Sequence, residues 1–384
     1  MRIGIITYWQ TTSNYGQMLQ NFALQKLLLD IGHEPYLIRY AHSEVKLSDW
    51  LDILKMSIFT IIENVRRRRF VKPSRRVSLT IIEPKDDSRK FIDFKNKELK
   101  QSDKVYYSLY ELQTTPPEAD AYIAGSDQIW GKTLKFKENS AFFLNFGKVN
   151  TKRIAYACSF GNTVYTGIWL KLLSNNLKRL DAISVREATG CQQCLKAGYN
   201  AEIVLDPTML HDGDFYRNYF KIPVERIPRV FIYSLNISDS EDIGWSDLRD
   251  SIANTWKVCV TPASGYLPSR ELFGSDVDYV YATIEQWLEL IACSKLVVTT
   301  SFHGIVFCLL FHTPFIFVPL NGKRSKANRR VLDLLDTLGI KGRVYEAGIS
   351  YSNIIKKELE WDNIDSAIRE LRYNSFEFLK TNLS

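Results

Sequence analysis

The chain has 384 residues, of which 45% are hydrophobic and 13% aromatic, and its formal net charge is +7. This composition excludes an intrinsically disordered protein, and the length suits two domains better than one. No run of 18 apolar residues is present to span a membrane, and residues 1–6 lack the features of a signal peptide, so we expect a cytoplasmic protein.

Strand and helix patterns alternate from the first residues onward. Residues 3–8 predict a strand, residues 16–30 carry apolar side chains at helical spacing, and residues 35–40 predict a second strand. Further apolar runs suit strands buried on both faces of a parallel sheet. In this half of the chain they lie at 121–124, 153–157, 182–185 and 203–205.

The pattern restarts after residue 206. Apolar runs recur at 229–235, 258–260, 296–300 and 314–318, and a closing helix is predicted at about 364–379. We therefore predict an α/β protein with two Rossmann-like domains, at 1–210 and 211–384, whose parallel sheets face a central cleft.

A charged, helical insertion is expected at about 44–110. Its segment Arg66–Arg76 holds seven positive residues and follows an amphipathic stretch. Such a segment could dock on an anionic membrane surface, or it could be a packed helix followed by a solvated loop.

Several classes of site find little support. Cys191 and Cys194 form a CxxC without a second pair, and no His/Asp/Glu cluster has metal-ligand spacing, so we expect no metal. The loop 12–17 has one glycine, which argues against a dinucleotide fingerprint. Aromatic residues do not alternate with the basic ones, so we expect no nucleic acid partner.

Polar residues at the ends of predicted strands are the candidates for a site. His303 lies where an apolar strand ends and a helix begins, so it could donate a proton beside a bound anion, or it could be structural. Asp127 could act as a base or bind sugar hydroxyls beside Ser126, and Trp130 could stack on a sugar. Alternatively, Ser126 or Asp127 caps a following helix.

Basic and amide side chains complete the candidate site. Arg186 suits a carboxylate or phosphate, although an ion pair with Glu187 or another acid is equally open. Asn14 and Gln17 could line the cleft. The loop 321–330 could bind an anionic substrate or could be solvated; it contains Lys323, Arg324, Asn328 and Arg330.

Taken in order, these motifs resemble the polysaccharide pyruvyl transferase family. The matching stations are Asn14-Tyr15-Gly16, Gly125-Ser126-Asp127-Gln128-Ile129-Trp130, Ser159-Phe160-Gly161, Ser184-Val185-Arg186-Glu187, Leu205-Asp206-Pro207-Thr208, Ser301-Phe302-His303-Gly304, and Asn328 with Arg330. Each motif alone is weak, whereas their joint order is specific.

The resemblance implies a fold similar to the GT-B glycosyltransferases, with the acceptor on the first half and the donor on the second. It implies transfer of a carboxyethylidene group from phosphoenolpyruvate, a co-substrate, to two hydroxyls of a galactose- or mannose-type hexose in a capsular or exopolysaccharide precursor. Phosphate is released and no cofactor is needed. His303 would be the general acid, Arg186 and Lys323 would hold the donor, and Asp127 would be the base.

One position departs from the family pattern. Where many members carry an arginine two residues before the histidine, this chain has Ser301, as in a Ser-Phe-His-Gly branch. Arg324, Arg329 or Arg330 could replace the missing charge.

Two other functions compete with this interpretation. One is a GT-B-like glycosyltransferase that uses a nucleotide sugar, and the other is a membrane-associated scaffold built on Arg66–Arg76. A polyprenyl-diphosphate-linked acceptor would fit an enzyme at the inner face of the cell membrane.

Overall fold

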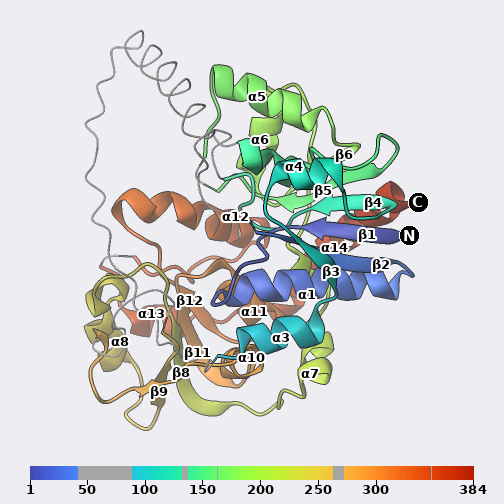
Figure 1. Ribbon diagram of the computed structural model, residues 1–384. Helices are drawn as coiled ribbons and strands as arrows, with labels where there is room; N and C mark the ends of the chain where they lie inside the picture. Colours follow the sequence, from blue (N-terminus) through green and yellow to red (C-terminus); the bar gives the residue numbers. More distant parts are fainter. Residues whose placement is uncertain (42–88, 132–136, 162, 263–271, 347) are drawn as a thin grey trace.

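The computed structural model describes residues 1–41, 89–131, 137–161, 163–262, 272–346 and 348–384. Most of the predicted insertion, including Arg66–Arg76, lies outside these residues. Two parallel sheets, each with its own helices, form the described part of the molecule (Figure 1).

The first sheet has the strand order β3-β2-β1-β4-β5-β6-β7, and every neighbouring pair is parallel. Its central strands are apolar because helices cover both faces. The strands are β1 (Arg2–Ile6), β2 (Glu34–Tyr40), β3 (Gln101–Tyr106), β4 (Ala121–Ala124), β5 (Lys152–Cys158), β6 (Ala182–Val185) and β7 (Glu202–Ile203).

The second sheet is also parallel and has the order β10-β9-β8-β11-β12. Its strands are β8 (Ile227–Tyr233), β9 (Lys257–Val260), β10 (Asp278–Tyr279), β11 (Ser294–Thr299) and β12 (Phe315–Phe317). In both sheets the order of the strands reverses beside the first strand, between β1 and β4 and between β8 and β11. Ligands of such sheets bind at the carboxyl ends of the strands where the order reverses.

The described helices follow the strands in an alternating pattern. They are α1 (Tyr15–Asp30), α3 (Phe91–Glu98), α4 (Leu109–Thr114), α5 (Ile168–Leu177), α6 (Ala188–Lys196), α7 (Gly213–Phe220), α8 (Trp245–Ser251), α10 (Ile284–Ala292), α11 (Phe302–Leu310), α12 (Arg329–Thr337), α13 (Tyr351–Ile355) and α14 (Trp361–Leu383). Short 3₁₀ helices are η1 (Lys137–Phe143), η2 (Pro207–Met209), η3 (Ser240–Ile243) and η4 (Gly322–Asn328).

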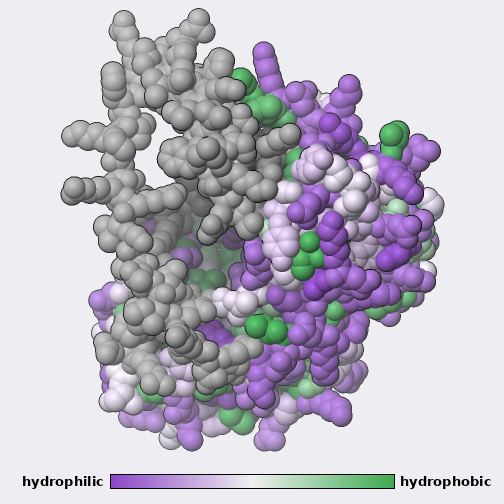
Figure 2. Space-filling model, in the orientation of Figure 1, coloured by the Kyte–Doolittle hydropathy of each residue, from purple (hydrophilic) through white to green (hydrophobic). Residues whose placement is uncertain are grey.

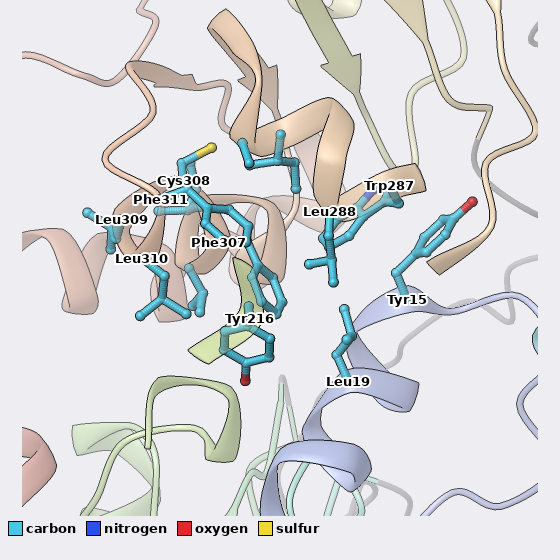
Figure 3. Close-up of a cluster of buried hydrophobic side chains, with 14 of the residues drawn as sticks. Tyr15, Leu19, Tyr216, Trp287, Leu288, Phe307, Cys308, Leu309, Leu310 and Phe311 are labelled. Atoms are coloured by element: carbon cyan, nitrogen blue, oxygen red, sulfur yellow. The ribbon is translucent and has the colours of Figure 1, made fainter. Parts of the chain in front are cut away.

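Helix α1 joins the two halves into one hydrophobic core. It is buried on nearly all sides because it packs against its own sheet and against α10 and α11 of the other half. Tyr15 stacks on Trp287 with ring centroids 4.9 Å apart, and its hydroxyl donates to the carbonyl oxygen of Ala282 at 2.6 Å. Figure 3 shows Tyr15 and Leu19 pointing from α1 toward Trp287 and Leu288 of α10.

Helix α14 packs against both sheets. Its first half packs with the second sheet through Ile364 and Ile368. Its last turns instead pack on the first sheet, where Phe378 and Leu379 join the cluster around Ile3. The two chain ends consequently lie side by side (Figure 1).

The strands predicted from apolar runs are all present, and the two that were not predicted lie at sheet edges. β3 has the sequence Gln-Ser-Asp-Lys-Val-Tyr and is partly exposed, as befits an edge strand. β10 has two residues. Neither carries the apolar signal of a strand buried on both faces.

Hydrophilic residues cover most of the described surface in the view of Figure 2, and hydrophobic residues are scattered among them in small groups. Among the described helices, none combines the length and apolar character needed to cross a bilayer.

Candidate active site between the sheets

A cleft of about 380 Å³ lies where the carboxyl ends of the central strands of both sheets meet. Its lining includes Asn14 and Asp127 from the first half and Asn236, His303 and Arg330 from the second. A neighbouring hollow of about 530 Å³ shares Asn14, Asp127 and Gln128 with the cleft and extends over the first sheet. A larger cavity, of about 640 Å³ between α7, α11 and α14, contains none of the predicted site residues.

His303 is the second residue of α11 and reaches the first half of the molecule. Its Nε2 atom lies 3.5 Å from Oδ2 of Asp206, which follows β7 of the first sheet. On its other side the ring lies against Gly16 at the start of α1. A Cβ atom at Gly16 would be only 1.9 Å from Nδ1, so this contact requires a glycine.

Arg186 lies at the centre of a buried group of charges. Its Nη1 donates to Oδ2 of Asp206 at 2.8 Å, its Nη2 donates to Oδ1 of Asp127 at 3.2 Å, and its Nε lies 3.8 Å from Oε2 of Glu187. Only 1% of the Arg186 side chain is exposed. Burial opposes its charge, but the surrounding carboxylates raise the pKa of Arg186 above its ordinary value.

The carboxylates of this cluster respond differently to burial. Burial alone would raise the pKa of Asp127, but nearby positive charges, chiefly Arg186, outweigh it and lower that pKa. In the same way, His303 and Arg186 overcome burial and hold the pKa of Asp206 well below its usual range. Burial prevails at Glu187 and raises its pKa.

Asp127 is fixed by its backbone as well as by Arg186. Its φ of 83° lies in the left-handed region that few residues other than glycine adopt. Its Oδ2 accepts from Nε2 of Gln17 at 2.7 Å, and its backbone N–H donates to Oγ of Ser126 at 2.6 Å. Ser126 in turn donates to Oδ2 of Asp206 at 3.2 Å. No helix begins within residues 125–131, so the alternative that these residues cap a helix is wrong.

Arg330, in the first turn of α12, faces the cleft beside His303. Both of its terminal nitrogens donate to the amide oxygen of Gln128, at 3.1 and 2.7 Å, in the orientation that the hydrogen-bonding pattern favours. The ring of Phe302 lies 5.6 Å from its guanidinium carbon and 5.1 Å from that of Arg186. Burial and the charge of Arg186 lower the pKa of Arg330 to about 10. A bound anion would therefore stabilise the charged form of Arg330.

Among the described residues, no group of three or more His, Cys, Asp or Glu side chains is arranged to hold a metal ion. The carboxylates of Asp127 and Asp206 are instead both paired with Arg186. The predictions that the protein uses neither a metal nor a cofactor remain untested by this arrangement.

The model of one protein family, described as polysaccharide pyruvyl transferase, matches residues 14–321. The chain belongs to this family. The match extends from the Asn14 cap of α1 across both sheets and past His303, and therefore includes both sides of the cleft. No curated protein sequence gives a significant match.

The likeness to a solved structure supports a GT-B-like fold for this member of the polysaccharide pyruvyl transferase family. The Anabaena protein HepE, in complex with UDP and glucose, is similar with a TM-score of 0.52 and 11% identity, over 100% of this chain and 97% of that chain. UDP-GlcNAc 2-epimerase from Neisseria meningitidis, bound to UDP-GlcNAc, gives a TM-score of 0.47 and 9% identity, over 100% and 99%. At such identities the likeness concerns the fold alone.

Five of the twelve predicted site residues line this pyruvyl transferase cleft, and a sixth lines the adjoining hollow, whereas two others do not serve as expected. Trp130 is fully buried, stacked on Phe143, and donates to the carbonyl oxygen of Phe142, so it cannot stack on a sugar. Asn328 is buried with its amide bound to the backbone of Leu320. Trp130 was misjudged because an aromatic residue after a strand fits a core position equally well.

Other predicted residues have local roles. Ser301 caps α11 by accepting from the N–H of Gly304, and Asn14 caps α1 by accepting from that of Gln17. The ion pairs of Arg186 match the alternative left open by the sequence, and its side chain does not line the cleft. The side chains of Lys323 and Arg324 lie outside the described part of the structure, so their roles stay predictions.

Three residues of the site were not predicted to have roles there: Asp206, Gln128 and Gly16. All three belong to the matched motifs. Asp206 follows an apolar run and precedes a proline. This pattern could have marked it as a site residue as well as the pattern around Asp127 did. Gly16 has no side chain that could react or bind, so only its contact with His303 in the structure shows that it belongs to the site.

Proposed function

We propose that this protein transfers a carboxyethylidene group from phosphoenolpyruvate to two hydroxyls of one hexose and releases phosphate. The observation that carries this proposal is the meeting of the matched motifs around His303, in a cleft that also contains Arg330. The same proposal has three finer parts. The chain belongs to the Ser-Phe-His-Gly branch, the acceptor is of the galactose or mannose type, and the acceptor is part of a capsular or exopolysaccharide precursor.

The reaction needs an acid, a place for anionic charge and a nearby diol. His303 would protonate the methylene carbon of the enol, which makes the adjacent carbon electrophilic. A first sugar hydroxyl then attacks that carbon, and a second hydroxyl displaces phosphate and closes the ketal. Two hydroxyl protons are released: one of them restores His303, and the other leaves with the phosphate.

The donor would bind on the α11 side of the cleft. Arg330 is buried enough to gain from an anion, and it donates to a neutral amide rather than to a carboxylate of the described residues. The side chain of Ser301 caps α11 and carries no charge. Arg330 would therefore replace the arginine that many family members carry at the position of Ser301. The Arg330→Ala variant should raise the KM for phosphoenolpyruvate about tenfold or more, and an unchanged KM would remove Arg330 from the donor site.

The acceptor would bind in the hollow over the first sheet. That hollow is lined by neutral hydrogen-bonding groups, including Tyr8, Gln17 and Thr163, which suits an uncharged sugar. Asp127 lies where the hollow meets the cleft, but its lowered pKa makes it a weak base. We propose that it accepts hydrogen bonds from the sugar and assists the transfer of the hydroxyl proton only as that proton becomes acidic.

The first test is phosphate release from phosphoenolpyruvate by the purified protein, with a panel of galactosides and mannosides. We expect release that depends on the acceptor and that His303→Ala abolishes. Thermal-shift measurements with phosphoenolpyruvate and with UDP-sugars address the rival donor. Stabilisation by UDP-sugars alone would favour a glycosyltransferase, a reaction for which the fold likeness to HepE gives weak support.

A membrane role is a separate proposal that rests on the sequence of Arg66–Arg76. A polyprenyl-diphosphate-linked acceptor would then meet the enzyme at the inner face of the membrane. Sedimentation with anionic vesicles should be weakened when Arg66, Arg67, Arg68 and Arg69 are replaced by alanine. Equal binding of both proteins would exclude this role.

A further inference from the structure

The partner of His303 comes from the opposite sheet. Nε2 of His303 is buried and has no hydrogen-bond partner of good geometry among the described residues. The group that it faces is Oδ2 of Asp206, at 3.5 Å, which is close enough for an ion pair and slightly long for a hydrogen bond. A buried imidazole nitrogen that faces a carboxylate needs a hydrogen to donate, which the neutral Nε2–H tautomer and the charged imidazolium both supply. The negative charge of the carboxylate favours the imidazolium of the two.

We infer that Asp206 is a positioning residue for His303, which holds the imidazole across the cleft and favours its protonated form. This inference rests on the proposed function, because it matters for catalysis only if His303 acts as the acid. It assigns a role to a residue that contacts neither the cleft nor the reacting atoms.

Asp206 is rigidly held for such a role. Its Oδ1 accepts from the backbone N–H of Thr208 at 3.1 Å and from the Thr208 hydroxyl at 2.7 Å. Its Oδ2 accepts from Ser126 at 3.2 Å and from Arg186 at 2.8 Å. The carboxylate is fully buried and therefore has a single orientation in which to meet the histidine.

The balance of charge around His303 supports the same inference. Two guanidinium groups, Arg186 and Arg330, are surrounded by three carboxylates, so with all three carboxylates ionised the cluster carries a charge of −1 while His303 is neutral. Asp127 and Glu187 both lie near Arg186 and offset its charge. Asp206 is therefore not fully neutralised by Arg186, and a proton on His303 makes the cluster neutral.

This arrangement prepares the acid before the donor arrives. A protonated imidazole beside the cleft meets the anionic donor with a favourable charge, and the proton is then given up to carbon. While the imidazole is neutral, Asp206 keeps the ring in place, and it favours the return of His303 to the protonated form. The carboxylate and the acid come from different sheets, so the acid is correctly held only while the two halves stay packed together.

The test compares Asp206→Asn with Thr208→Val. Asparagine keeps an oxygen to accept from the Thr208 N–H but loses the charge, whereas Thr208→Val removes only the hydroxyl bond to Oδ1. NMR titration of protein labelled at the histidine Cε1, with the signal assigned by His303→Gln, follows the imidazole without any substrate. We expect Asp206→Asn to lower the titration midpoint of His303 by about one pH unit and Thr208→Val to leave it nearly unchanged.

Phosphate release gives the second readout. Asp206→Asn should shift the alkaline limb of the kcat/KM profile to lower pH by the same amount. If Asp206→Asn is folded and the His303 midpoint stays in place, the inference is overturned. A shifted midpoint in a protein that releases no phosphate with any acceptor would contradict the proposed function but uphold the pairing.

A second variant covers the case in which Asp206→Asn does not fold. The double variant Asp206→Asn/Arg186→Met removes one carboxylate and one guanidinium together, so that the net charge of the cluster stays as in the wild type. Its His303 midpoint should fall in comparison with Arg186→Met alone. Equal midpoints in the two proteins would overturn the inference.

Discussion

His303 in α11 and Gly16 in α1 come from the two halves of the molecule, and each limits which residue can stand at the other position. The imidazole occupies the space in which a side chain of residue 16 would begin. Because Gly16 lies in the first turn of α1, the glycine is not needed for the helix itself, which alanine would favour. Its value therefore lies in the position of the histidine ring.

We expect Gly16→Ala to reduce phosphate release about 100-fold, because a displacement of the acid of about 1 Å has an effect of that size. The overlap should also cost about 1–3 kcal/mol of stability, which the better helix propensity of alanine offsets only in part. In a His303→Ala background the same substitution should raise the melting temperature, since the clash is gone. Wild-type activity in Gly16→Ala would contradict the steric argument.

Arg186 provides a second prediction at this scale. We expect Arg186→Met to lower the free energy of unfolding by about 3–5 kcal/mol at pH 7, because it leaves buried carboxylates without their cation. In the wild type, the lowered pKa values of Asp127 and Asp206 contribute stability above pH ~4 that is lost as the pH falls. The gap between the two proteins should therefore narrow on acidification.

Urea unfolding between pH 7 and pH 3.5 measures this gap. The control is Arg249→Met, which removes an exposed arginine paired with Asp276 at 3.0 Å and should cost less than about 1 kcal/mol at any pH. A gap that stays constant with pH would mean that Arg186 stabilises through packing rather than through charge.

At the level of elements, α14 supports the strand end that carries Asp206. The hydroxyl of Ser375 accepts from the backbone N–H of Leu205 at 2.9 Å and donates to the carbonyl oxygen of Leu371 at 2.7 Å. From the other side, the hydroxyl of Tyr156 donates to the carbonyl oxygen of Leu205 at 3.1 Å. The residue before Asp206 is thus anchored by a helix and by a central strand.

We expect Ser375→Ala to cost about 1–3 kcal/mol of unfolding free energy, since it leaves the buried N–H of Leu205 without a partner. It should also lower kcat, because Asp206 is released to move. The matched control is Ser366→Ala in the same helix, whose exposed hydroxyl donates to the carbonyl oxygen of Asp362 and accepts from the exposed side chain of Arg369. Its loss should change stability by less than about 0.5 kcal/mol. Equal effects of the two variants, measured by urea unfolding, would refute this role for Ser375.

At the level of the whole molecule, the two halves share one core instead of meeting at a polar boundary. Residues of α1 and of α10 and α11 belong to the same buried cluster, which includes the Tyr15–Trp287 stack (Figure 3). Interfaces between domains that move are usually smaller and more polar than this. We therefore expect the halves to behave as one unit.

Urea unfolding followed by tryptophan fluorescence and by far-ultraviolet circular dichroism should give coincident transitions for the full chain. A fragment of residues 1–210 lacks α14 and the partners of Tyr15, so we expect it to be unfolded by circular dichroism and to show poor dispersion by NMR. A fragment with a cooperative transition of its own would contradict the shared core.

The sequence allowed the sheets to be predicted better than the contacts between them. Strands buried on both faces carry apolar runs, and therefore β4 and β6 were predicted to the residue. The edge strand β3 was not predicted, because half of it faces solvent and it therefore lacks a continuous apolar run. The contacts of His303 with Gly16 and Asp206 depend on how the two halves pack, and the spacing of residues along the chain does not predict that packing.

The path of α14 has a consequence for how the protein is made. The core of the first sheet is closed by Phe378 and Leu379, which the ribosome adds after every strand of both sheets. Until then the apolar face of β1 has no cover at that place, although β1 is among the first segments to emerge. Nascent chains should therefore depend on chaperones until synthesis reaches α14, and shortening this helix should lower the yield of protein far more than its distance from the cleft suggests.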